Sequence, residues 1–264
     1  MTDLPADDPT RRFSNRVADY VKYRPTYPAA VLDTLAAKVG LRRGWTAADV
    51  GSGTGIFTRQ LLDYGLRVYG VEPNEDMRAA AETLLAGYPD FTSIAARAEA
   101  IPLPDGSVEI VTAAQALHWF DFSLASREFR RLLKPGGVIA LVWNTRDVRA
   151  PFVAALEALL REYGTDYYKT SHAALQEPDK DAGITGFFAP DAFNKEEFEN
   201  PQFLTWEQFS GRVLSSSYVP LAGHPNHAPL MAAIDELFGA HQQGGTVALP
   251  YVTELYWARV GAGG

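Results

Sequence analysis

Cysteine is absent from the 264 residues, so the chain has no disulfides and no thiolate metal ligands. Long apolar runs are also absent. The longest ones, such as Val138–Trp143, are far shorter than the ~20 residues that a membrane-spanning helix needs. Lys and Arg never occur in runs longer than two, and the formal net charge is −8. Nucleic-acid-binding proteins usually carry a basic patch. We therefore expect no nucleic acid and no membrane among the partners.

The composition is that of an ordinary globular protein, with 47% hydrophobic and 21% charged residues. A chain of 264 residues is long enough for one large α/β domain with an added lid. Residues 1–12 are polar and are expected to be flexible. They lack the basic and apolar regions of a signal peptide, which favours a cytoplasmic protein. Its oligomeric state is left open between a monomer and a homodimer.

One stretch of the sequence has the character of a ligand-binding turn. Residues 47–50 predict the end of a buried strand, and Ile56–Leu62 predict the start of a helix. Between them lie Gly51, Gly53 and Gly55, and glycine lets the backbone bend tightly and approach a ligand closely. The free N–H groups of the following helix point into the same turn. The stretch therefore predicts a nucleotide-type pocket.

The spacing of these glycines argues against a dinucleotide. The dinucleotide-binding pattern G-x-G-x-x-G needs a third glycine. That position holds Ile56 when counted from Gly51, and Thr58 when counted from Gly53. Asp49 lies two residues before the first glycine. A carboxylate there suits a ligand with a cationic amine and repels a pyrophosphate.

A second acid ends the next predicted strand. Glu72 follows the β-rich run Leu66–Val71 and lies 21 residues after Gly51, close to the ~20 residues typical of a ribose-binding carboxylate. Its two oxygens can accept hydrogen bonds from both ribose hydroxyls. NAD requires the same acid, so Glu72 alone does not separate the two kinds of nucleotide.

Two later segments carry candidate site residues. Met77 falls in the first turn of a predicted helix, where it either lies against an adenine or fills the core. His118 follows the predicted strand 107–114, at the carboxyl edge where open α/β sheets bind ligands. Its ordinary pKa near ~6.5 suits a general base, but it could instead only shape the pocket. Trp119 and Phe120 either line the substrate side or pack in the core.

Several motifs occur in an order that resembles one protein family. They are the stretch Asp49–Gly55, the acid Glu72, the A-E-x-x-P-x-x-D segment 98–105, the H-W-F-D segment 118–121 and the K-P-G-G turn 134–137. This set resembles class I S-adenosylmethionine-dependent methyltransferases with a methyltransferase type 11 domain. The H-W-F-D segment and the N-terminal region look most similar to a small-molecule branch that includes trans-aconitate methyltransferase.

The resemblance implies a Rossmann-like α/β fold, with a seven-stranded, mostly parallel sheet whose last strand is antiparallel, helices on both faces and a helical lid insertion. It implies S-adenosylmethionine as the cofactor and S-adenosylhomocysteine as its product, and we expect no metal. Asp49 would accept from the α-amine of the cofactor, and Ala98 and Glu99 would close over its adenine. The expected cofactor-binding residues are Asp49, Gly51, Ser52, Gly53, Thr54, Gly55, Glu72, Pro73, Asn74, Met77, Ala98, Glu99, Gln115 and Ala116.

The N-terminal stretch 13–28 resembles a motif that is common in this branch. Its aromatic residues and arginine either cap the methionine end of the cofactor or only pack a helix onto the domain. The residues expected on the substrate side or in the cap are Phe13, Tyr20, Tyr23, Arg24, His118, Trp119 and Trp143.

The implied activity is direct in-line transfer of a methyl group to a small-molecule acceptor. A carboxylate acceptor attacks as it stands, whereas a hydroxyl must first lose its proton to His118 or to a tyrosine. Two alternatives remain: a nicotinamide-dependent oxidoreductase on a similar sheet, and a module that binds the cofactor without catalysis. The glycine spacing counts against the first, and the complete motif set counts against the second.

Periodicity and resemblance together divide the chain into a core and a lid. Residues 13–145 form the expected cofactor-binding core, and 146–192 and 205–226 form lid insertions. Residues 193–204 and 227–260 are expected to supply the C-terminal strands and helix that complete the sheet. The predicted helices are 28–39, 56–64, 75–85, 123–133, 152–163, 206–214 and 226–241, the predicted strands are 46–50, 67–72, 91–98, 107–114, 138–143, 193–204 and 246–260, and 167–190 is predicted as a loop.

Overall fold

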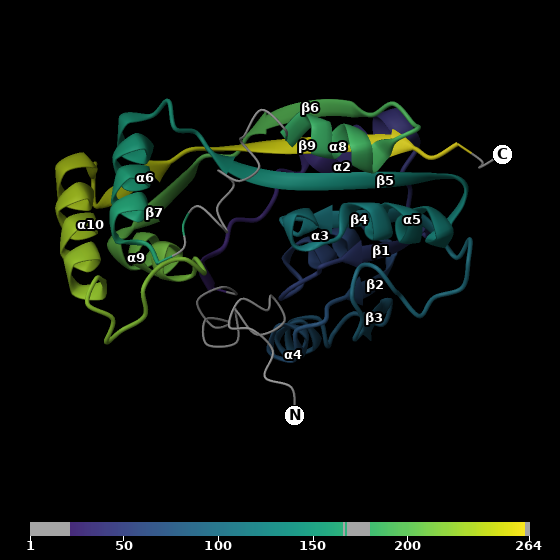
Figure 1. Cartoon of the computed structure of the whole chain (residues 1–264), viewed down its shortest axis with the longest axis horizontal. Coiled ribbons are helices and arrows are strands. Elements are labelled where there is room, and N and C mark those ends of the chain that lie inside the picture. Colours follow the sequence, from purple (N-terminus) through teal and green to yellow (C-terminus); the bar gives the residue numbers. More distant parts are fainter. Residues whose placement is uncertain (1–21, 166, 168–179, 262–264) are drawn as a thin grey trace.

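The computed structural model describes residues 22–165, 167 and 180–261. Its centre is one sheet whose strands are β1 (Thr46–Val50), β2 (Arg67–Val71), β3 (Phe91–Ile94), β4 (Val108–Ala114), β5 (Leu133–Arg146), β6 (Asn194–Glu199) and β9 (Tyr251–Arg259). These seven strands lie in the order β3-β2-β1-β4-β5-β9-β6 (Figure 1). Only β9 runs against its neighbours. The predicted Rossmann-like sheet with an antiparallel last strand is thus confirmed.

Helices cover both faces of the sheet, as predicted. They are α2 (Ala30–Val39), α3 (Ile56–Tyr64), α4 (Glu75–Leu84), α5 (Phe122–Leu132) and α8 (Lys180–Phe188). Leu35 and Leu61, from α2 and α3, pack with residues of the sheet in one buried cluster. Phe129 and Phe187, from α5 and α8, pack in a second cluster. Burial of these apolar residues on both faces holds the sheet as a central layer.

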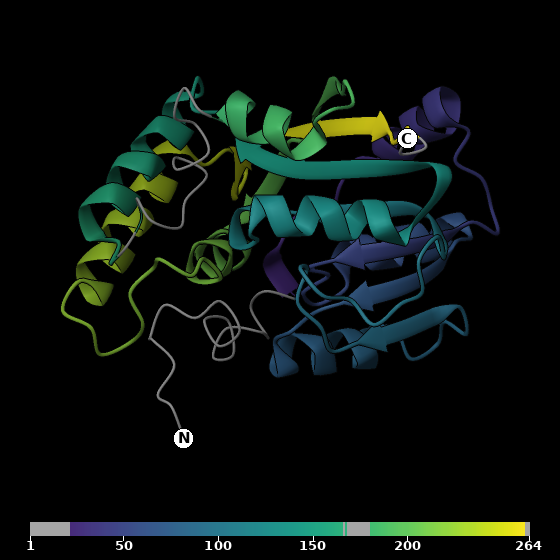
Figure 2. The same cartoon turned by 45° about the vertical axis from the view of Figure 1, so that its right-hand side comes forward.

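A smaller lobe lies at one end of the sheet, where β5 runs toward it (Figures 1 and 2). It consists of α6 (Pro151–Tyr163), α9 (Trp206–Leu214), α10 (His227–His241) and a two-stranded sheet of β7 (Gln202–Thr205) and β8 (Thr246–Leu249). We call it the cap lobe. Phe152, Phe209 and Phe238 belong to its own buried cluster. No helix in the described part of the chain has the length and apolarity needed to cross a membrane.

Two expected strands are each divided between the two sheets. The predicted strand 193–204 is β6 and β7, and the predicted strand 246–260 is β8 and β9. Pro201 and Pro250 lie at the divisions, and a proline has no N–H to donate to a continuous strand ladder. The chain therefore passes from the main sheet into the cap lobe after β6, and returns to the main sheet with β9.

The helix α8 was not expected, because the sequence predicts a loop over 167–190. Two of its residues are glycines, which lowers helix propensity. Ile184, Phe187 and Phe188 are buried against α5 and the sheet, and this burial outweighs the weak local preference. The structure also divides core and lid differently from the expectation, since α8 packs on the main sheet and α10 belongs to the cap lobe.

Local signals at helix starts are confirmed. Asn74 begins α4 by accepting a hydrogen bond from the Met77 N–H at 2.9 Å. Thr205 and Gln208 form a reciprocal capping box at the start of α9. Both starts depend on residues close in sequence, which is why they could be predicted.

Candidate active site

The glycine turn links β1 to α3 at the carboxyl edge of the sheet. Gly53, at its tip, has a φ of +56°, a conformation that residues with a Cβ rarely adopt. A Cβ built on Gly53 meets no atom of the described residues within 4 Å, whereas one on Gly51 would overlap Ala116 and one on Gly55 would lie 2.9 Å from Leu85. Gly51 and Gly55 thus allow close packing inside the protein, and Gly53 faces open space.

Glu72 lies beside this opening. One of its carboxylate oxygens accepts from the Gly53 N–H at 2.9 Å, and the other accepts from the Asn74 N–H at 2.9 Å. The residue is 9% exposed, and burial raises the pKa of its carboxyl group despite these hydrogen bonds. Each oxygen has a further lone pair, so Glu72 fixes the turn and can still accept from a ligand hydroxyl.

Asp49 lies beneath the turn and is 1% exposed. Its two carboxylate oxygens accept from the hydroxyls of Thr58 at 2.6 Å and Thr112 at 2.8 Å. Burial is the main cause that raises the pKa of Asp49 to about 6. Both oxygens are thus engaged within the protein, and the side chain has almost no surface left for direct contact with a ligand.

Thr54, in the turn, and Gln115, just after β4, each carry an unusual polar atom. Thr54 Oγ1 and Gln115 Oε1 are buried and have no hydrogen-bond partner in the part of the chain that the structure describes. Gln115 also has a φ of +57°, and such a backbone outlier costs about 1–3 kcal/mol and tends to occur at functional sites. Together with the open space at Gly53, these unsatisfied atoms mark the region as a candidate ligand site.

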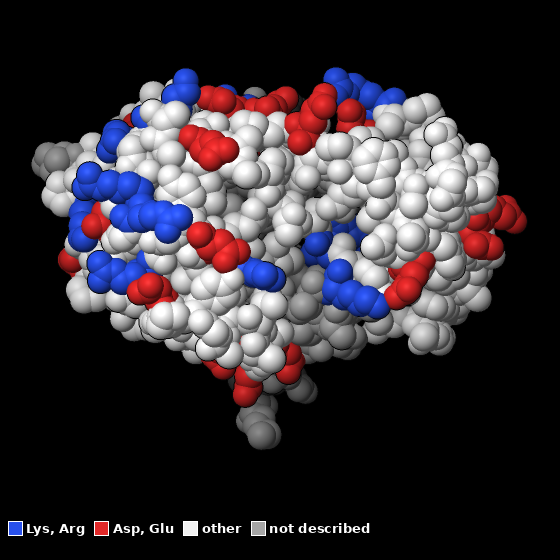
Figure 3. Space-filling model, turned by 180° about the vertical axis from the view of Figure 1, so that it is seen from behind, with Lys and Arg blue, Asp and Glu red and all other residues white. Residues whose placement is uncertain are grey.

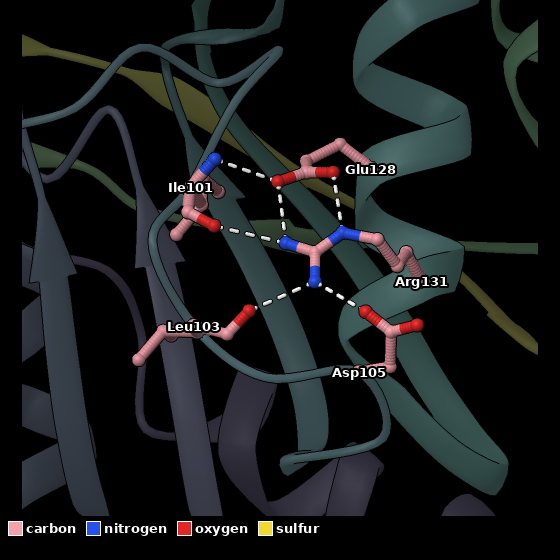
Figure 4. A network of polar contacts seen from close by, with 5 residues as sticks. All are labelled: Ile101, Leu103, Asp105, Glu128 and Arg131. Atoms are coloured by element: carbon pink, nitrogen blue, oxygen red, sulfur yellow. Dashed lines mark hydrogen bonds and ion pairs between the residues drawn. The ribbon is translucent and has the colours of Figure 1, made fainter.

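The loop that carries Ala98 and Glu99 is fastened to α5. Arg131 donates to the carbonyl oxygens of Ile101 at 2.9 Å and Leu103 at 2.8 Å, and it also binds the carboxylate of Glu128 (Figure 4). Glu128 in turn accepts from the Ile101 N–H at 2.6 Å. This network holds the loop expected to close over the adenine.

Glu99 itself is directed toward α5. One carboxylate oxygen accepts from the Asp121 N–H at 2.9 Å, and the other lies 3.6 Å from Arg97 Nε. Ala98 is buried in the main core. Glu99 therefore helps to fix the loop in the structure described here, in addition to any contact with a ligand.

Replacing Arg131 with methionine should loosen this loop. Charge-assisted hydrogen bonds are worth about 1.5–3 kcal/mol each, but Arg131 is partly exposed, so we expect a loss of about 1–3 kcal/mol in unfolding free energy. Urea denaturation measures it, and calorimetry with S-adenosylhomocysteine should show weaker binding. Arg127→Met, on the exposed side of α5, is the matched control. Equal stability and affinity in the two variants would show that the network does not hold the loop.

His118 lies in a short 3-10 helix (Leu117–Trp119) after β4, and its ring contacts that of Trp119, with centroids 4.8 Å apart. Burial, together with the nearby positive charge of Arg24, lowers the pKa of His118 to about 4. The imidazole is therefore neutral at pH 7. A base with so low a pKa accepts a proton only weakly at that pH, so His118 is poorly suited to act as a general base. A neutral hydrogen-bonding role fits it better.

The other expected substrate-side residues lie in different parts of the molecule. Tyr23 packs its ring against Gly211 of α9 and donates to Glu207 at 3.1 Å, so it joins the N-terminal segment to the cap lobe. Trp143 is 1% exposed and packs against Tyr256 in the core, which favours a packing role. Phe13 and Tyr20 lie outside the described residues.

The remaining cofactor-site expectations map to the same edge of the sheet. Ser52 donates its N–H to the Val71 carbonyl at 3.1 Å. Pro73 is exposed next to buried Asn74 and Met77 at the start of α4. Ala116 lies under Gly51, so the turn contacts the segment that carries His118.

Some supporting residues were missed by the sequence reasoning. The threonine partners of Asp49 lie on α3 and β4, and only folding brings them together. Glu128 and Arg131 have a detectable signal, since an acid and a base three residues apart on a helix can pair. In the described residues, no group of three or more His, Asp or Glu side chains is arranged to hold a metal ion.

Comparison with known proteins agrees with this geometry. A family model described as "methyltransferase domain" matches residues 48–141. An uncharacterized methyltransferase of Mycobacterium tuberculosis is 32% identical over 249 residues, covering 93% of this chain and 94% of the relative. A protein of Anaeromyxobacter dehalogenans, described as a type II methyltransferase, has a TM-score of 0.63 at 25% identity and covers 90% of this chain and 98% of its own.

A further solved structure shows the same fold with a ligand bound. It is phosphoethanolamine N-methyltransferase 2 of Haemonchus contortus in complex with S-adenosylmethionine, with a TM-score of 0.57 at 16% identity, covering 96% of this chain and 59% of that one. The sheet order and the glycine turn define a class I, Rossmann-like methyltransferase fold. The chain belongs to the methyltransferase family, and it is an enzyme that uses S-adenosylmethionine.

Proposed function

We propose that the enzyme transfers the methyl group to a small-molecule acceptor bearing a carboxylate or a hydroxyl, by direct in-line displacement. The observation that carries the proposal is the contact between the open glycine turn and the segment of His118 and Trp119. In the proposal, the cofactor site therefore lies next to the polar and aromatic side chains of that segment, at the carboxyl edge of the sheet.

When bound, the cofactor supplies a methyl group already activated by its sulfonium. An acceptor oxygen forms a bond to the methyl carbon as the carbon–sulfur bond breaks, and the electron pair of that bond stays on sulfur. The protein has to hold the two reactants in line, and such orientation can supply about 7–11 kcal/mol. In the proposal, Gly53 provides close approach, Glu72 holds the ribose, and the loop of Ala98 and Glu99 covers the adenine.

The acceptor side favours an oxygen that is already deprotonated. A carboxylate needs no general base, and His118, with its pKa lowered to about 4, is a weak one. A hydroxyl acceptor would have to lose its proton to another group or to water. Of the two acceptor classes proposed, the carboxylate is thus favoured, because it requires no general base among the residues near the turn.

Incubation with cofactor labelled on its methyl group tests the proposal. A set of small carboxylic acids, phenols and alcohols is supplied, and labelled product is separated by chromatography. We expect transfer to at least one oxygen acceptor. Transfer only to amines, or to a protein or nucleic acid, would contradict the acceptor class. Cofactor binding without transfer to any compound would favour a non-catalytic module.

The raised pKa of Asp49 predicts a pH dependence of cofactor affinity. In the folded chain this carboxyl is protonated below its pKa of about 6, whereas an aspartate in the unfolded chain protonates near ~3.9. Its contribution to stability is therefore complete below about pH 4 and is lost as the pH rises through about 6. A ligand with a cationic amine favours the ionised form, so affinity should fall up to about tenfold per unit below pH 6.

Calorimetry with S-adenosylhomocysteine at a series of pH values measures this slope. The variant Asp49→Asn cannot ionise, and we expect its affinity to be weaker at pH 7 and nearly constant over the same range. A slope that survives in Asp49→Asn would assign the titration to another group and contradict the role given to Asp49.

A further inference from the structure

Three arginines meet where the main sheet and the cap lobe join. Arg212, on α9, donates to the Tyr23 carbonyl at 2.9 Å and to the Tyr251 hydroxyl at 3.1 Å. Arg24, next to Tyr23 in the chain, donates to the Ser215 carbonyl at 3.1 Å, just beyond the end of α9. Arg146 ends β5 directly opposite Tyr251 in the strand ladder. The three arginines thus lie together where the lobes join, with Arg212 buried and Arg24 and Arg146 partly buried. We call this region the arginine neighbourhood.

The charge of Arg212 is not balanced by a carboxylate in the described part of the chain. Arg146 is ion-paired with Glu157 of α6 and donates to the Tyr218 hydroxyl at 3.0 Å. Arg212 is 4% exposed, and its described partners are a carbonyl and a hydroxyl. Its Nη2 is buried with no hydrogen-bond partner among the described residues. An unbalanced buried charge is costly, and a neutral side chain could pack there at lower cost.

The neighbourhood favours anions. Arg212 keeps its proton at neutral pH, because burial and the charges of Arg24 and Arg146 lower its pKa only to about 10. The same arginines lower the pKa of the Tyr251 hydroxyl despite its burial. Because Tyr251 accepts from Arg212, its own proton is free to be donated to another group. A planar guanidinium matches the geometry of carboxylate and phosphate oxygens.

This neighbourhood adjoins the expected acceptor side. Arg24 is close enough to His118 to lower its pKa, and Arg146 lies at the carboxyl end of β5, where ligands of such sheets bind. Figure 3 shows a hollow between the two lobes, with Lys and Arg atoms in and beside it. The chain as a whole has a negative net charge, so this cluster of basic side chains is a local feature.

We propose that Arg212, supported by Arg24, Arg146 and the Tyr251 hydroxyl, binds an anionic group of the methyl acceptor, either a carboxylate or a phosphate. The inference rests on the proposed small-molecule methyltransferase activity and narrows its acceptor to small anions. Arg212 holds the acceptor at a charged group and leaves the attacking oxygen beside His118. Its test measures anion binding directly and needs no methyl transfer.

The full chain, saturated with S-adenosylhomocysteine, is titrated with succinate, inorganic phosphate or neutral succinamide at constant ionic strength and followed by calorimetry. We expect saturable binding of at least one of the two anions and none of succinamide. Binding of succinate alone assigns a carboxylate site, and binding of phosphate alone assigns a phosphate site. If neither anion saturates wild-type protein, or if succinamide binds equally well, the proposal is overturned.

Variants separate anion binding from a purely structural role. Arg212→Gln should weaken the binding of the anion at least tenfold, and Arg212→Lys, which keeps the charge, should restore part of it. Arg161→Gln, on the exposed side of α6, should leave it unchanged. Affinity for S-adenosylhomocysteine and melting temperature are measured in parallel, and Arg212→Lys is the decisive variant if Arg212→Gln does not fold. Anion affinity equal to wild type in a folded variant without the charge, or no difference between Gln and Lys, would overturn the proposal.

Discussion

Replacing Glu72 with alanine should lower the affinity for S-adenosylhomocysteine by about 100-fold or more. A hydrogen bond to a charged group is worth about 1.5–3 kcal/mol, or about 10- to 100-fold in affinity. In the proposal, Glu72 accepts hydrogen bonds from the ribose hydroxyls with two oxygens. The same change removes the acceptors of the Gly53 and Asn74 N–H groups, so the turn also loses its fixed geometry. Calorimetry with the demethylated cofactor measures the loss.

Glu82→Ala is the matched control for this change. Glu82 lies on α4, where it is half exposed and pairs with Arg78, so its removal should leave the affinity unchanged. Circular dichroism should show that the Glu72→Ala variant keeps its sheet, because Glu72 does not belong to the apolar clusters that hold the sheet. Undiminished affinity in folded Glu72→Ala would refute the assignment of Glu72 to the ribose.

Replacing Gly53 with leucine should weaken cofactor binding by about 10- to 100-fold. The new side chain would project into the space that opens at Gly53, where the cofactor is expected. Overfilling a close-fitting site costs about 1–3 kcal/mol, and each 1.4 kcal/mol is about tenfold in affinity. The change is measured as the dissociation constant of S-adenosylhomocysteine.

Gly40→Leu separates this effect from backbone strain. Gly40 ends α2 with a φ of +69°, and a Cβ there also lies more than 4 Å from every atom in the part of the chain that the structure describes. Both variants should therefore lose similar stability, about 1–2 kcal/mol, but only Gly53→Leu should lose affinity. Equal affinity in the two variants would show that the open space at Gly53 does not hold the cofactor.

The part of the fold that could be predicted is the part determined by neighbouring residues. The strand and helix on either side of the glycine turn begin and end as expected, because a short apolar run, three glycines and an amphipathic helix lie consecutively in the chain. The caps at Asn74 and Thr205 were predicted for the same reason. The overall sheet came from resemblance to a family, since no local pattern specifies strand order.

The arrangement of the second half could not be predicted from local patterns. The helix α8 exists because Phe187 and Phe188 bury themselves on a distant part of the fold. The arginine neighbourhood joins Arg212 to Tyr23 across 189 residues of sequence. Of these arginines, only Arg24 was expected at the site from the sequence, and no pattern singled out Arg146 or Arg212. Their convergence depends on how the cap lobe packs against β5 and β9, which periodicity does not encode.

The candidate site shows the same division. Asp49, Gly53 and Glu72 were identified from spacing and meet at one edge of the sheet. The sequence alone could not distinguish the structural role of each residue from those of the others. Only the structure distinguishes the open position at Gly53 from the packed positions at Gly51 and Gly55, or shows that Asp49 is sealed beneath the turn.

The central claim is that the glycine turn holds an adenosine with an amino-acid tail and not a diphosphate. Thermal denaturation with each ligand tests it most directly. S-adenosylhomocysteine at ~100 times its dissociation constant should stabilise the fold by about 2.7 kcal/mol, a rise of about 5–10 °C in melting temperature for a chain of this size. NAD at the same concentration should leave the melting temperature unchanged. A rise with NAD and none with S-adenosylhomocysteine would contradict the account.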